Sequence, residues 1–221
     1  MNENFEKIKE ELAQTNTTLV AVSKTKSVEE IMHLYHQGQR IFGENKVQEL
    51  VEKHEQMPTD IQWHLIGHLQ TNKVKYIAPF VAMIHAVDSL KLLFEINKEA
   101  EKNNRIIPVL IQIHIAKEET KFGADEKELI EMIEYYTAAD SKLKHISIVG
   151  LMGMATNTDD EKTISNEFQS LKKLFHFIKE SYLIHKKDFT ELSMGMSSDY
   201  QIAIKQGSTM VRIGSLLFGN R

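Results

Sequence analysis

The chain has 221 residues and a formal net charge of −4; 42% of its residues are hydrophobic and 26% are charged. This is the composition of a globular protein, and its basic residues form no cationic stripe along which a phosphate backbone could bind, so we expect no nucleic-acid partner. The absence of cysteine excludes disulfides and thiolate metal sites.

The sequence also argues against a membrane protein. The longest apolar run, residues 106–116, is shorter than the roughly 20 residues that a membrane-spanning helix needs. The first residues, MNENFEKIKEELAQTN, are too charged for the apolar part of a signal peptide. We therefore expect a cytoplasmic protein that makes no contact with a membrane.

Short apolar runs alternate along the chain with polar segments of helical period, as expected when parallel strands are covered by crossover helices. The expected strands are residues 18–23, 40–43, 62–66, 81–86, 107–115, 146–151, 191–194 and 210–213. The expected helices are residues 4–14, 27–37, 45–54, 89–103, 126–137 and 159–181. Ser27 and Ser89 are expected to cap two of these helices at their N-termini.

Eight strands at about 28 residues per unit favour a (β/α)8 barrel, because an open doubly wound sheet usually has five or six parallel strands. The chain has only three prolines and no linker rich in Gly and Ser. The sequence therefore predicts an α/β fold made of a single (β/α)8 TIM-type barrel with an extra N-terminal helix, forming one domain over residues 1–221.

In such a barrel the functional face lies where the strands end. The polar and flexible residues at the expected strand ends are Lys24, Glu44, Asn45, Gly67, His68, Asp88, Met152, Ser197 and Arg212. Lys24 directly follows the apolar run LVAVS, where partial desolvation favours a neutral amine that can attack an aldehyde. The alternative is a lysine that reaches into solvent. Lys26, two residues further on, is expected to face elsewhere.

The last part of the chain suggests a second feature, an anion site. In STMVRIGSLLFG a strand runs into Gly214 and Ser215 and then into a short helical turn, whose free N–H groups can receive a phosphate. Ser197 and Ser198 in the preceding SMGMSSDY segment are expected at the same place. The alternative is an ordinary C-terminal turn.

Seven motifs in this order resemble one known family: AVSKTK, FGENKVQE, WHLIGHLQTNK, KFG, GLMGM, LSMGMSSD and STMVRIGSLLFG. The chain resembles the YggS/PROSC group of pyridoxal 5'-phosphate (PLP) homeostasis proteins, which are related to the barrel domain of alanine racemase and have PLP fold type III. The resemblance extends from about Leu19 to Gly219.

The resemblance implies a role in cofactor binding for seven residues. Lys24 would form the Schiff base with PLP, and Arg212 would approach the pyridine nitrogen. A guanidinium that donates to this nitrogen disfavours its protonation and makes the ring a weaker electron sink. The resemblance also implies that Ser197, Gly214 and Ser215 bind the phosphate and that Asn45 and Met152 line the ring.

Alanine racemase uses a tyrosine from a second, β-rich domain, and we expect no such domain in this chain. The acid–base candidates within the chain are His64, His68 and Tyr200. The sequence departs from the family pattern at Lys46, where a tyrosine is frequent, and at Ser198, where an aspartate is frequent. These departures put contacts at the rim in doubt and leave the cofactor assignment unchanged.

The histidines offer little support for a metal site. His64 and His68 have the spacing of a metal pair, but HLIGH lacks the glutamate of a zincin and runs off a strand, so we expect no metal. His33 and His36 are expected on an exposed helix.

The leading hypothesis is a PLP carrier or reservoir in PLP homeostasis, without dedicated catalytic activity. Apo PLP-dependent enzymes would be transient partners, and we expect a monomer. A PLP-dependent, amino-acid racemase-like enzyme is the first alternative. The second is a PLP-free barrel that uses Lys24 as an aldolase-like Schiff base on a phosphorylated sugar.

Overall fold

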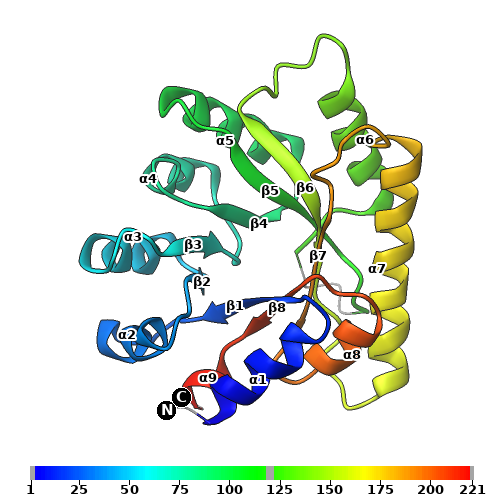
Figure 1. Cartoon of the computed structure of the whole chain (residues 1–221). Coiled ribbons are helices and arrows are strands. Elements are labelled where there is room, and N and C mark those ends of the chain that lie inside the picture. Colours follow the sequence, from blue (N-terminus) through cyan, green and yellow to red (C-terminus); the bar gives the residue numbers. More distant parts are fainter. Residues whose placement is uncertain (1–2, 118–121, 220–221) are drawn as a thin grey trace.

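Eight parallel strands close into a barrel in the computed structural model, which describes residues 3–117 and 122–219 (Figure 1). Each strand pairs with the next one along the chain, and β8 pairs with β1 to close the ring. The expected (β/α)8 barrel is therefore confirmed. The strands are β1 (Thr18–Val22), β2 (Ile41–Glu44), β3 (Gln62–Leu65), β4 (Met83–Val87), β5 (Ile107–Ile113), β6 (Ile146–Gly153), β7 (Glu191–Met196) and β8 (Met210–Ile213).

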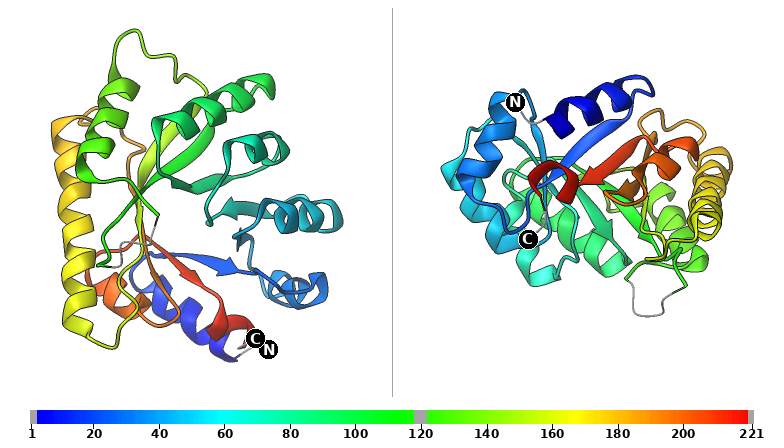
Figure 2. Two further views of the ribbon diagram at one scale, coloured as in Figure 1. Left: turned by 180° about the vertical axis from the view of Figure 1, so that it is seen from behind. Right: turned by 90° about the horizontal axis from the view of Figure 1, so that it is seen from below.

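Helices surround the strands, as two opposite views of the molecule show (Figures 1 and 2). Within the described parts of the chain, no helix is both long enough and apolar enough to cross a membrane. The α-helices are α1 (Glu3–Ala13), α2 (Val28–His36), α3 (Val47–Gln56), α4 (Val74–Ile77), α5 (Leu90–Lys102), α6 (Glu126–Thr137), α7 (Glu161–Ser181), α8 (Tyr200–Lys205) and α9 (Ser215–Phe218), and the 3-10 helix η1 spans Thr71–Lys73.

The expected helix starts at the two serines are confirmed. Ser27 caps α2 in a reciprocal arrangement: its hydroxyl accepts from the Glu30 N–H at 3.2 Å, and the Glu30 carboxylate accepts from the Ser27 N–H at 2.8 Å. Such a capping box satisfies N–H groups that have no partner within the helix. The Ser89 hydroxyl accepts from the Leu92 N–H at the start of α5.

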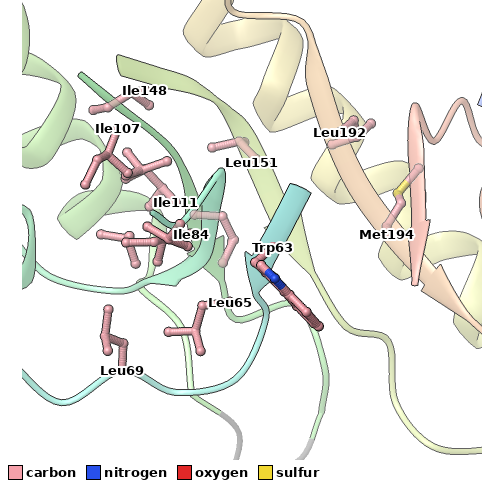
Figure 3. Close-up of a cluster of buried hydrophobic side chains, with 14 of the residues drawn as sticks. Trp63, Leu65, Leu69, Ile84, Ile107, Ile111, Ile148, Leu151, Leu192 and Met194 are labelled. Carbon is pink, nitrogen blue, oxygen red and sulfur yellow. The ribbon is translucent and has the colours of Figure 1, made fainter. Parts of the chain in front are cut away.

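The strands carry apolar residues on their outer face and several polar residues on their inner face. On β3, Trp63 and Leu65 belong to the apolar layer between strands and helices, while His64 between them faces the barrel interior, because successive side chains of a strand alternate. On β7, Leu192 and Met194 belong to the same apolar layer (Figure 3). The barrel interior can therefore hold polar groups without weakening the apolar layer outside.

The sequence did not predict three short elements: η1, α4 and α8. Each spans no more than six residues, which is too short for a 3.6-residue period to be recognised. Some strand ends also differ from expectation: β5 ends at Ile113 instead of residue 115, and β6 continues to Gly153 instead of ending at residue 151.

Candidate functional site

A cavity of about 490 Å³ opens at the carboxyl ends of the strands, and this volume is within the usual range for small-ligand pockets. Six of the seven residues expected to hold the cofactor line it, and Met152 is the exception. The lining residues come from six strand ends and the start of α9: Val22, Lys24, Asn45, Ile66, Met154, Met196, Ser197, Ser198, Arg212, Gly214, Ser215 and Leu216.

Lys24 stands in a tight turn that directly follows β1. The Lys26 N–H donates to the Ser23 carbonyl oxygen at 3.0 Å and closes this turn. Thr25 has a φ of +64°, in the left-handed region that a β-branched residue rarely adopts. Lys24 is half-buried and lines the cavity. The turn therefore presents a primary amine to the cavity.

The segments that follow β7 and β8 form another part of the cavity wall. The Gly214 N–H donates to the Ser197 hydroxyl at 3.2 Å. A Cβ at Gly214 would lie only 3.2 Å from the Val22 carbonyl oxygen, so a glycine lets the chain pass close to β1. Ser215 begins α9, and the first N–H groups of a helix have no partner within it. Figure 1 shows β1 and β8 next to each other, which brings this segment to the Lys24 turn.

Arg212 on β8 supplies a buried cation. Only 4% of the residue is exposed. Its Nη1 donates to the Ser193 hydroxyl at 2.7 Å, and its Nη2 donates to the Gly153 carbonyl oxygen at 3.0 Å. Burial lowers the pKa of Arg212 to about 10, against the opposing effect of nearby Asp199, so the guanidinium remains protonated at neutral pH. These two bonds fix its plane at the cavity and leave further donors on the group.

Ser193 links Arg212 to two histidines inside the barrel. The Ser193 Oγ lies 3.2 Å from His85 Nδ1, and His85 Nε2 lies 2.9 Å from His64 Nδ1. Burial lowers the pKa of His64 to about 3. Burial, together with His64 and Arg212, lowers the pKa of His85 well below its ordinary value. Both rings are therefore neutral at pH 7.

These bonds form a continuous chain from Arg212 to His64. The Ser193 hydroxyl accepts from Arg212, and it can still either donate to His85 Nδ1 or accept from it, according to the tautomer of His85. The same tautomer decides which of His85 and His64 donates to the other. Arg212 and His64 were expected from the sequence to be functional candidates, whereas Ser193 and His85 were not. The sequence marks Ser193 and His85 in one way: each is the single polar residue within an apolar run, LSM for Ser193 and MIHAV for His85.

Asn45 and Met152 differ in where they lie. Asn45 follows β2 and lines the cavity, and Gly67 packs so closely on its backbone that a Cβ at Gly67 would overlap it. Met152 is fully buried and packs with Ala86 in the barrel interior, whereas Met154 lines the cavity. Contact of Met152 with a bound ring stays a prediction.

None of the three acid–base candidates lines the cavity. His64 is buried and bonded to His85. The ring of His68 stacks on Phe122, with 4.4 Å between the ring centroids. The Tyr200 hydroxyl donates to Glu11 of α1 at 2.7 Å, and burial and this bond raise the pKa of Tyr200 to about 12. The fold therefore places the three acid–base candidates at three different sites outside the cavity lining.

Of the remaining side chains that the sequence singled out, Ser198 lines the cavity, whereas His33, His36 and Lys46 do not. His33 and His36 are exposed on α2, and Lys46 is exposed at the start of α3. Across residues 3–117 and 122–219, no three His, Asp or Glu side chains gather in a way that could hold a metal ion. Lys121 of the KFG motif lies outside the described residues.

Eight parallel strands closed into a barrel, with helices between them, are the fold of the barrel of alanine racemase. The chain belongs to the family described as "Alanine racemase, N-terminal domain", whose sequence model matches residues 1–221. The resemblance expected from the motifs is confirmed by relatives that are named pyridoxal phosphate homeostasis protein.

Two such relatives are similar over most of their length. The protein of Aquifex aeolicus is 40% identical over 204 residues, which is 92% of this chain and 86% of the relative. The protein of Helicobacter pylori is 42% identical over 202 residues, which is 90% of this chain and 86% of the relative. Among solved structures, PipY of Synechococcus elongatus PCC7942 with PLP bound has a TM-score of 0.88 and 31% identity, covering 99% of both chains.

Proposed function

We propose that this chain binds PLP as a Schiff base on Lys24 and takes part in intracellular PLP homeostasis as a carrier or reservoir, without dedicated catalytic activity. It does so in the cytoplasm as a single barrel domain over residues 1–221. The observation that carries the proposal is one cavity lined by Lys24, Arg212 and the Ser197 to Gly214 contact. Relatives named for PLP homeostasis and a PLP-bound structural neighbour support it.

The residues present fit this cofactor. When bound, PLP supplies an aldehyde that condenses with an amine, an aromatic ring and an anionic phosphate. Lys24 supplies the amine, and the N–H groups at the start of α9 with the Ser197 hydroxyl are donors suited to phosphate. Asn45 offers a polar group and Met154 an apolar surface for the ring.

Arg212 supports a holding role over a catalytic one. The two bonds to Ser193 and Gly153 keep the guanidinium in place, and the group stays charged because its pKa is about 10. With PLP bound, a permanent donor at the ring nitrogen would keep that nitrogen unprotonated and would limit how strongly the ring withdraws electrons. The Tyr200 hydroxyl is bonded to Glu11 and does not line the cavity, so this phenol is not placed to act as an acid or base on a ligand there.

The experiment that tests cofactor binding is an absorbance spectrum of the purified protein with added PLP, before and after borohydride. We expect a visible Schiff-base band that borohydride removes, and peptide mapping should then locate the reduced adduct on Lys24. The Lys24→Ala variant should lack the band, while Lys91→Ala, at an exposed lysine on α5, should keep it. A band of full strength in Lys24→Ala would overturn the assignment.

Delivery is tested separately from binding. We further propose that the protein is a monomer and contacts apo PLP-dependent enzymes transiently. Holo protein is mixed with an apo PLP enzyme, and the rate at which the enzyme regains activity is measured. This rate should exceed the rate at which the holo protein releases PLP into a solution that contains an excess of a PLP scavenger. Reactivation no faster than free release would contradict delivery, and a reservoir role would then remain. Sedimentation of the holo protein alone checks the monomer.

A further inference from the structure

A buried ionic network lies beside the Lys24 turn. Lys53 on α3 is 7% exposed. Its ammonium group donates to the Glu44 Oε1 at 2.7 Å and to the Ser23 carbonyl oxygen at 2.8 Å, and it lies 3.5 Å from the Glu49 Oε2. Ser23 is the residue that precedes Lys24. One cation therefore joins the end of β2, the first turns of α3 and the start of the Lys24 turn.

Glu44 holds the side chain of the same serine. It is fully buried, and its Oε1 accepts from the Ser23 hydroxyl at 2.7 Å as well as from Lys53. Burial raises the pKa of Glu44 above its ordinary value, although the bonds from Lys53 and Ser23 act in the opposite direction. Its second oxygen, Oε2, has no partner within the described parts of the chain. Burying a carboxylate in this way costs free energy, and the ion pair with Lys53 offsets part of that cost.

Glu49 holds the next residue of the turn. Its Oε2 accepts from the Thr25 N–H at 2.8 Å. Burial alone would raise the pKa of Glu49, but the Thr25 N–H and Lys53 outweigh it and lower the pKa, so the carboxylate is charged at neutral pH. Thr25 has the left-handed φ of +64°, at a turn position where glycine is usual. A non-glycine residue keeps such a conformation only when its surroundings impose it.

Together these contacts fix the backbone on both sides of Lys24. The Ser23 carbonyl oxygen, the Ser23 hydroxyl and the Thr25 N–H are all bonded to Glu44, Glu49 or Lys53. None of the three charged residues lines the cavity. Glu44 and Glu49 belong to the FGENKVQE motif. Of the residues in this motif, which the structure describes in full, Asn45 alone lines the cavity.

We propose that Glu44, Glu49 and Lys53 form an ionic clamp that positions the Lys24 turn for Schiff-base formation. They act as positioning residues, since they hold Ser23 and Thr25 and do not line the cavity. The inference rests on the proposed function, because it needs Lys24 to be the residue that reacts with PLP. It adds one requirement for Schiff-base formation that the cavity lining does not supply: the backbone on both sides of Lys24 must be held in place.

The test separates the covalent bond from the rest of binding. PLP and pyridoxine 5'-phosphate are titrated into the apo protein; the second ligand has an alcohol in place of the aldehyde and cannot form an imine. In Glu49→Ala we expect the affinity for PLP to fall about tenfold, the factor that loss of one charge-assisted hydrogen bond produces. The affinity for pyridoxine 5'-phosphate should stay unchanged, because the cavity wall is intact.

Three further variants make the test specific. Glu49→Gln keeps an oxygen that can accept from the Thr25 N–H, and it should recover much of the PLP affinity. Glu49→Asp keeps the charge but shortens the side chain, and it should lose affinity as Glu49→Ala does. Glu52→Ala removes an exposed carboxylate from the same helix and serves as the matched control, with both affinities unchanged.

The results that overturn the clamp differ from those that overturn the proposed function. An equal loss for both ligands in Glu49→Ala and Glu49→Asp would indicate general damage to the cavity and refute positioning. No loss for either ligand would also refute it. By contrast, an unchanged PLP affinity and absorbance band in Lys24→Ala would refute the proposed function itself.

Discussion

Replacing Lys53 by methionine should destabilise the protein in a pH-dependent way. The substitution keeps most of the side-chain volume and removes the only cation within hydrogen-bond reach of Glu44 in the described structure. At the 2.7 Å separation of Nζ and Oε1, the direct attraction at an effective dielectric constant of about 20 is about 6 kcal/mol. Since desolvation offsets part of it, we expect Lys53→Met to cost about 3–5 kcal/mol, as when one partner of a buried ion pair is removed.

The pH dependence follows from Glu44. Burial raises its pKa in the folded state above the value in the unfolded chain, and loss of Lys53 should raise it further. A carboxyl of this kind contributes stability below its unfolded pKa, and this contribution is lost as the pH rises through the folded pKa. The destabilisation by Lys53→Met should therefore be largest at about pH 8 and smaller at about pH 5, where part of Glu44 becomes protonated.

Urea denaturation of the apo protein at both pH values measures this effect. The double variant with Glu44→Gln and Lys53→Met should recover most of the lost free energy of unfolding, because it removes the unpaired charge together with its partner. Lys173→Met, at an exposed position on α7, is the control and should change stability little. A cost below about 1 kcal/mol, or a cost that does not depend on pH, would refute the reasoning.

Three other outcomes follow from the structure. Arg212→Lys should weaken PLP binding about tenfold in a titration, because one ammonium cannot reproduce the planar contacts of the guanidinium with Ser193 and Gly153; an unchanged affinity would contradict this. The ring of His64 has a pKa of about 3 and should therefore stay neutral from about pH 5 to about pH 8 in nitrogen-15 NMR spectra. Because the pKa of His64 is lower in the folded than in the unfolded state, its contribution to the free energy of unfolding is lost as the pH falls below about 6.5. Ser27→Ala removes the α2 cap and should cost about 1 kcal/mol in urea denaturation, and an unchanged midpoint would count against the capping box.

The sequence was informative where local pattern and barrel topology agree. Alternating apolar runs gave all eight strands, and the rule that functional residues follow the strands brought Lys24, Asn45 and Ser197 to one cavity. Gly214 and Ser215 could be placed with them because β8 must pair with β1 to close the barrel. These inferences needed only the order of the strands and no side-chain detail.

The exact depth of a side chain in the barrel could not be predicted in the same way. The pairing of β5 with β6 shifts between Val109 and Leu110, whose partners are Ile148 and Gly150. This irregularity changes which residues of β6 face inward. Met152 and Met154, two positions apart, share the inward face, but Met152 lies deeper in the interior packing and Met154 lies at the cavity. Nothing in the run ISIVGLMGM distinguishes the two methionines.

Long-range pairing of buried polar groups was also beyond the sequence. Ser193 and His85 stand 108 positions apart and meet only because the barrel closes around them. Glu44 was expected at the functional face as a strand-end residue, and it instead binds Lys53 of the following helix. A local pattern shows that such a residue is polar within an apolar run, but it cannot name the partner.

The local charge of the cavity explains how a chain with a net charge of −4 can be suited to an anion. In the described structure the lining includes Lys24 and Arg212 and no acidic side chain. Two carboxylates adjacent in sequence to lining residues do not line the cavity themselves: Glu44 accepts from Lys53, and Asp199 accepts from the Met196 N–H. Fixed charges and dipoles at short range in a partly buried site outweigh distant surface charges, which water and salt screen. The binding preference of this barrel therefore depends on where the charged groups lie around the cavity, and the sum of charges over the sequence does not reveal it.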